Sequence, residues 1–246
     1  MSTVVYYILS ALAVLITLSI HEYFHGYAAY KLGDPTAKSL GRLTLNPIKH
    51  LDPFGAICMV LFHFGWARPV PINARYFKNP KRDFAITALA GPVSNLTMSF
   101  ISAFLYALLL KLFSGVSFSS ELVYSIVQNT VNFIYIFHIV NIGIALFNLI
   151  PVPPLDGSRI LCAVLPQKTY FAIMRYERTI YYVLIGWLLL GGYVSGFLLN
   201  IGFISNNAVL SAIARIFSLS NLLSDGIEAL SEIMIKLFTS IPFLKT

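Results

Sequence analysis

Long apolar stretches separated by short polar segments run through most of this 246-residue chain. They lie near residues 4–31, 83–113, 123–150 and 175–204. Each is at least as long as the roughly 20 residues that a helix needs to cross a bilayer. Glycine or proline follows several of them, where a helix should end. The pattern predicts an all-α polytopic membrane protein with a helical bundle over residues 1–204.

Two further segments depart from the spanning pattern. Residues 56–66 are apolar but too short to cross a bilayer, and the alternating prolines Pro69 and Pro71 follow them. We therefore expect a short re-entrant, strand-like segment near residues 56–73. Residues 205–246 form an amphipathic stretch, which predicts a C-terminal helix that packs on the bundle, lies at the membrane surface or crosses the membrane.

Composition and charge support a membrane protein. Hydrophobic residues make up 57% of the chain and charged residues 11%, against about 25% charged in a soluble domain. Much of the positive charge lies in two groups: Lys38, Arg42, Lys49, Arg68, Arg75, Lys78, Lys81 and Arg82, then Arg159, Lys168, Arg175 and Arg178. The positive-inside rule predicts that both groups are cytoplasmic and that the N-terminus is outside. Loop placement explains this balance more simply than nucleic-acid binding, so the expected partner is the lipid bilayer, with no nucleic acid.

The first apolar stretch contains an ionisable cluster, Ser19-Ile20-His21-Glu22-Tyr23-Phe24-His25. Residues at i and i+4 lie on one face of a helix, so His21 and His25 can reach a single Zn²⁺. Glu22 can take a proton from zinc-bound water, as in the H-E-x-x-H pattern of zinc metalloproteases. The alternative is a chance arrangement of two histidines hydrogen-bonded in a core. An unpaired cluster is costly in lipid, which favours the zinc interpretation.

A proline-rich break follows the third apolar stretch. Pro151, Pro153 and Pro154 end that stretch, and unwound backbone at membrane depth is tolerated only where it is buried in protein or lines a cavity. Asp156 comes directly afterwards and can supply a third zinc ligand, which leaves the fourth position for water. Alternatively, or in addition, Asp156 caps the N-terminus of the next helix.

Five motifs occur in a characteristic order. They are His21-Glu22-x-x-His25, Gly33-Asp34-Pro35-Thr36, Gly65-Trp66-Ala67-Arg68-Pro69-Val70-Pro71, Ala90-Gly91-Pro92-x-Ser94-Asn95 and Asn148-x-x-Pro151-x-Pro153-Pro154-Leu155-Asp156-Gly157. Together they resemble the site-2 protease family of intramembrane zinc peptidases, and most closely its compact bacterial and archaeal branch without PDZ or CBS domains. The resemblance covers about residues 5–180.

The resemblance implies that the bundle is an intramembrane metalloprotease domain with one Zn²⁺ per chain. It implies His21, His25 and Asp156 as the zinc ligands and Glu22 as the general base. Asn148 is a weaker implication, as a group that holds the substrate backbone or the oxyanion.

The resemblance also implies a substrate and a location. The expected substrate is a single-pass transmembrane protein cleaved within or near its membrane helix, in regulated intramembrane proteolysis. Its unwound backbone would pair with the segment at residues 65–73. The expected location is the cell (plasma) membrane, with a multi-pass topology and the active site toward the cytoplasmic side.

Two other functions compete with this interpretation. A metal transporter could use the His–Asp cluster as a transit site, but it would not need Glu22, and transporters usually have repeated halves, which this sequence lacks. A membrane zinc protease of another kind would use a glutamate ligand. The remaining glutamates lie in no second-helix motif: Glu121, Glu177, Glu228 and Glu232.

Overall fold

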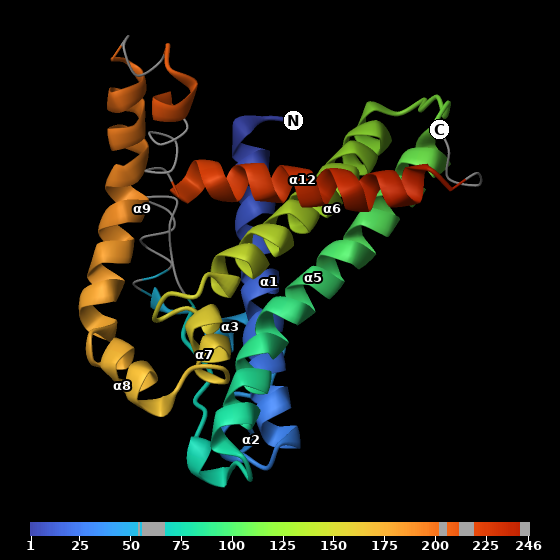
Figure 1. Cartoon of the computed structure of the whole chain (residues 1–246). Coiled ribbons are helices and arrows are strands. Elements are labelled where there is room, and N and C mark those ends of the chain that lie inside the picture. Colours follow the sequence, from blue (N-terminus) through green and yellow to red (C-terminus); the bar gives the residue numbers. More distant parts are fainter. Residues whose placement is uncertain (54, 56–66, 202–205, 212–218, 242–246) are drawn as a thin grey trace.

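The computed structural model describes residues 1–53, 55, 67–201, 206–211 and 219–241. Its named elements are helical (Figure 1): α1 Thr3–Lys31, α2 Thr36–Ser39, α3 Pro47–His50, the 3₁₀ helix η1 Ala74–Tyr76, α5 Pro80–Phe113, α6 Glu121–Leu149, α7 Asp156–Cys162, α8 Gln167–Arg175, α9 Glu177–Leu199 and α12 Leu219–Thr239. The described residues contain no β-strand, only an isolated bridge between Leu51 and Ala67. The predicted all-α class is confirmed.

Three of the helices, α1, α5 and α6, are long and apolar enough to cross a membrane. Two halves of α9, Glu177–Leu188 and Tyr193–Leu199, are bent by 50° and together form a fourth candidate span. Helix α5 begins at Pro80, three residues before the predicted start, because proline fits the first helical turn, where its missing N–H costs nothing. Ser120 caps α6, its hydroxyl accepting a hydrogen bond from the Val123 amide.

Helices α1, α5 and α6 pack against one another (Figure 1). Small side chains allow the helices to approach closely. Ala13, Ala103 and Ala145, one from each helix, are fully buried. Polar contacts add to this packing, since the Asn141 amide of α6 donates to the Thr17 hydroxyl of α1 at 3.0 Å. The bundle core therefore consists largely of small and hydrogen-bonded side chains, as expected where lipid surrounds the helices.

Helix α12 runs transversely across α6 and α5 (Figure 1). The buried ring of His138 in α6 links it to the bundle, because Nδ1 donates to the Ser99 carbonyl at 2.9 Å and Nε2 accepts from the Ser231 hydroxyl at 3.0 Å. Phe238 packs against buried alanines of α5, among them Ala107. Helix α12 packs on the bundle, which is one of the three arrangements left open for the C-terminal stretch.

The predicted re-entrant segment is described only in part, since residues 56–66 lie outside the described residues. Residues 68–73 form non-helical backbone, which Ala67 joins to Leu51 through the isolated antiparallel bridge. The Arg68 amide donates to the His50 carbonyl at 2.8 Å. This backbone lies against α1, where the Val70 amide donates a hydrogen bond to the Glu22 carboxylate.

Candidate metal centre

Helix α1 presents His21 and His25 on one face, as their spacing predicts. Both side chains are buried, with relative exposures of 4% and 6%. Their Nε2 atoms lie 2.9 Å apart, and the rings meet edge to face. One helical turn therefore aims two imidazole nitrogens at a common point.

The break after α6 brings a carboxylate to that point. Helix α6 ends at Leu149, and α7 begins at Asp156, whose Oδ2 lies 3.1 Å from Nε2 of both histidines. The predicted N-cap role is wrong. Leu155 occupies the N-cap position, and no side-chain hydrogen bond caps α7, because the carboxylate faces the histidines. At Gly157 a Cβ atom would lie 2.3 Å from the Leu149 carbonyl oxygen, so only glycine lets α7 start this close to α6.

The three converging atoms match a zinc site in type and spacing. Two imidazole nitrogens and one carboxylate oxygen are a common catalytic donor set, and ligands of a tetrahedral zinc ion lie about 3.3–3.6 Å apart. The three separations here are 2.9, 3.1 and 3.1 Å, so shifts of about a few tenths of an ångström would admit the ion. Among the described residues, His21, His25 and Asp156 are the group identified as able to hold a metal ion. No glutamate belongs to it, which argues against a glutamate-ligand site in the described part of the chain.

The backbone of α5 fixes the orientation of one histidine. Nδ1 of His25 lies 2.7 Å from the Thr87 carbonyl oxygen, which can only accept, so Nδ1 carries the proton and Nε2 offers its lone pair. Outer hydrogen bonds of this kind are typical of metal-binding histidines. Nδ1 of His21 is buried and has no partner among the described residues. The two imidazoles are therefore held differently.

Glu22 faces the non-helical segment at residues 68–73. Its Oε2 accepts a hydrogen bond from the Val70 amide at 2.7 Å. The same segment is held from its carbonyl side by Arg42, whose guanidinium donates to the carbonyls of Arg68 and Pro69 at 2.7 and 3.3 Å. In the described part of the chain, the Val70 amide is the main-chain donor that holds the Glu22 carboxylate, and it contacts one of the two carboxylate oxygens.

Asp34, directly after α1, anchors the far end of this segment. It is fully buried and accepts hydrogen bonds from the Thr36 amide at 2.9 Å, the Thr36 hydroxyl and the Asn73 amide at 2.6 Å. The Gly33-Asp34-Pro35-Thr36 motif therefore connects the end of α1 to the segment that contacts Glu22.

We expect Asp34→Asn to lower the stability of the protein by about 1–3 kcal/mol, because an amide nitrogen in place of one oxygen leaves a buried donor unpaired. Thermal unfolding in detergent measures the change. Asp225→Asn, at an exposed position of α12, is the matched control and should change stability by less than about 0.5 kcal/mol. Equal melting temperatures for Asp34→Asn and the wild type would contradict the anchoring role.

Asn148 does not join the metal-binding group. Its side-chain amide donates to the Ile144 carbonyl of its own helix at 3.0 Å, and the side chain is half-buried. Its assignment to substrate or oxyanion binding stays a prediction.

Sequence reasoning did not assign the main-chain partners of the site. The Thr87 carbonyl and the Val70 amide are backbone groups, which leave no residue-type signal. Arg42 and Asp34 did leave a signal. Asp34 lies in one of the five motifs, and Arg42 is among the basic residues attributed to loop charge.

Comparison with known proteins decides the family. The profile of Peptidase family M50 matches residues 9–191, well over half of the chain. The chain belongs to peptidase family M50. Membership in this family, the site-2 protease family, makes it an intramembrane zinc metalloprotease, and it favours that activity over the metal transporter.

Individual relatives of known name agree with the family. The chain is 40% identical over 208 residues to the "Putative zinc metalloprotease YwhC" of Bacillus subtilis, an alignment that covers 84% of this chain and 91% of the relative. Rip2 of Mycolicibacterium smegmatis, which carries the same description, is 27% identical over 65% of this chain and 58% of its own length. Rip2 of Mycobacterium tuberculosis strain Erdman is 23% identical over 70% and 67%. No solved structure matches the chain.

Proposed function

We propose that His21, His25 and Asp156 hold one zinc ion per chain and that Glu22 is the general base of this protease. The observation that carries the proposal is the convergence of two Nε2 atoms and one Oδ2 atom within 3.1 Å of one another. A zinc ion bound there supplies Lewis-acid chemistry, because it polarises the peptide carbonyl and lowers the pKa of water.

The chain's own groups perform the proton transfers. The Glu22 carboxylate takes a proton from the attacking water and delivers it to the leaving peptide nitrogen. The Val70 amide holds one oxygen of that carboxylate and keeps it beside the histidines. Nδ1 of His25 carries its proton and donates it in a hydrogen bond to the Thr87 carbonyl, so Nε2 stays available for the ion.

The proposed substrate is a single-pass transmembrane protein, cleaved where its helix is unwound. An intact helix engages its carbonyls in i→i−4 hydrogen bonds, so attack requires an extended stretch. The non-helical segment at residues 68–73 supports this proposal because it borders Glu22 and offers main-chain groups for pairing. We propose Asn148 as a further contact to that stretch.

The proposed location is the plasma membrane, with the site toward the cytoplasm and no nucleic-acid partner. The support is the charge of the segments next to the site. Residues 32–79, which join α1 to α5, contain six basic residues, and the first turn of α5 adds Lys81 and Arg82, whereas the turn between α5 and α6 contains none.

The metal content of purified full-length protein tests the site directly. We expect about one zinc per chain in the wild type and a loss of at least about tenfold in zinc affinity for Asp156→Asn, because an amide is a poor zinc ligand. Asn148→Ala, a matched change outside the group of converging atoms, should retain the wild-type zinc content. A wild type without zinc after preparation free of chelators, or full occupancy in Asp156→Asn, would contradict the proposed ligands.

A further inference from the structure

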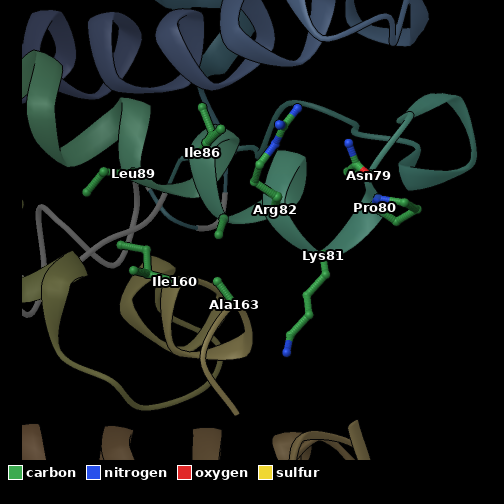
Figure 2. Close-up of a pocket in the computed structure, with 9 residues that line it drawn as sticks. Asn79, Pro80, Lys81, Arg82, Ile86, Leu89, Ile160 and Ala163 are labelled. Atoms are coloured by element: carbon green, nitrogen blue, oxygen red, sulfur yellow. The ribbon is translucent and has the colours of Figure 1, made fainter. Parts of the chain in front are cut away.

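A groove of about 690 Å³ lies between the first turns of α5 and helix α7 (Figure 2). Its lining residues do not include His21, His25 or Asp156. One wall is formed by Ile160 of α7 and by Ala163, the residue directly after this helix. Ile86 and Leu89 form part of the opposite wall on α5. The groove therefore borders the helix that begins with a proposed zinc ligand, and none of its lining residues has a role in the proposed chemistry.

The lining changes from polar to apolar along α5. Asn79 and Lys81 lie at the start of the helix, whereas Ile86 and Leu89 lie about one and a half to two turns beyond Lys81 and are 44% and 40% exposed. From Lys81 to Leu89 the helix rises about 12 Å. Because α5 is a candidate membrane span, the polar end lies where the helix begins and the apolar end lies deeper along the span. A ligand that fills both ends must be amphiphilic.

The polar end carries positive charge. The ammonium group of Lys81 donates to the Leu165 carbonyl at 2.7 Å, and in the described part of the chain it has no carboxylate partner. Figure 2 shows the Lys81 side chain extending from α5 toward α7. Arg82 pairs with the buried Asp83 at 2.9 Å, yet its side chain is 65% exposed. This charge favours an anionic head over a zwitterionic one, whose ammonium group Lys81 would repel.

We propose that the groove binds an anionic phospholipid of the surrounding bilayer. Its phosphate lies at Lys81 and one acyl chain follows Ile86, Leu89 and Ile160. A soluble anion would leave the apolar walls uncovered. Basic pockets between membrane helices are known sites for anionic head groups. The bound lipid would brace α7, and thereby Asp156, against α5.

Lipid binding to the purified full-length protein tests the proposal without relying on proteolysis. Native mass spectrometry compares bound phosphatidylglycerol with bound phosphatidylcholine in the wild type, Lys81→Gln and Lys78→Gln. Lys78→Gln is the matched control, because it removes the same charge at a residue that precedes α5 and does not line the groove. Arg82 is unsuitable, because replacing it would also unpair the buried Asp83.

We expect the wild type to prefer phosphatidylglycerol. Lys81→Gln should weaken binding of this lipid about fivefold, the equivalent of about 1 kcal/mol for one basic residue, whereas Lys78→Gln should not. Equal losses in both variants would overturn the proposal in favour of general surface charge. Equal binding of the two lipids by the wild type would overturn the anionic specificity.

A second variant tests the apolar end without changing charge. Ala163→Trp places a large side chain on the α7 wall, and we expect it to reduce bound phosphatidylglycerol at least about fivefold. Unchanged lipid binding in Ala163→Trp would show that the lipid lies elsewhere. Because neither readout depends on zinc or cleavage, failure of this proposal and failure of the proposed zinc site can be told apart.

Discussion

Glu22→Gln is expected to reduce peptide cleavage at least about a hundredfold while leaving the zinc content at the wild-type level. Proton transfer by a positioned side chain contributes about 10²–10⁴ to the rate, and an amide cannot accept the proton of the attacking water. The glutamine oxygen can still accept the Val70 amide hydrogen bond, so the adjacent backbone should keep its position. The measurement is cleavage of a single-pass substrate in detergent or liposomes, beside metal analysis of the same preparation.

The paired readout separates a base from a ligand. Asp156→Asn serves as the comparison, because loss of a ligand should lower zinc content and activity together. Loss of zinc in Glu22→Gln would indicate that Glu22 supports the structure of the metal site. Cleavage at the wild-type rate with zinc retained would show that Glu22 is not the general base and that another group takes the proton of the attacking water.

The helical architecture followed from the sequence because lipid restricts the alternatives. A long apolar run in a bilayer must satisfy its backbone internally, so helices α1, α5 and α6 lie where such runs were found. Their ends were less certain, since caps and first-turn prolines set them. With Pro80 in its first turn, α5 begins three residues before the predicted start, and α6, capped by Ser120, begins two residues before it.

The docking of α12 did not follow from the sequence. An amphipathic pattern states that one face is buried, but not against which surface. The hydrogen bond that fixes α12 joins His138 to Ser231, 93 residues apart, and neither residue stands out from other interior polar groups. Pairings of this length depend on the three-dimensional arrangement of the whole bundle.

The metal site was predictable to the extent that it uses side chains in recognisable spacing. His21 and His25 are one helical turn apart, and Asp156 follows a break that its three prolines make recognisable in the sequence. The supports of the site are different in kind. The Thr87 carbonyl and the Val70 amide belong to residues of ordinary type, and their contribution depends on backbone position alone.

Gly91 is the residue at which packing and metal binding meet most closely. An added Cβ atom would lie 2.4 Å from Nε2 of His25 and 2.6 Å from Cε1 of His21. Real Cβ contacts essentially never fall below 3.0 Å, so one of the groups would have to move. The His25 ring cannot shift freely, because its Nδ1 donates to the Thr87 carbonyl of α5, the helix that also contains Gly91.

Gly91→Ala is therefore expected to lower zinc occupancy to less than about half and to cost about 1–3 kcal/mol of stability through overpacking. Gly186→Ala is the matched control, since its Cβ would meet no atom within 4 Å and alanine favours a helix by about 1 kcal/mol over glycine. The same substitution should thus destabilise one helix and leave the other unchanged or more stable. Metal analysis and thermal unfolding of both variants measure this difference. Wild-type zinc content in Gly91→Ala would mean that α5 can withdraw from the histidines without loss of the site.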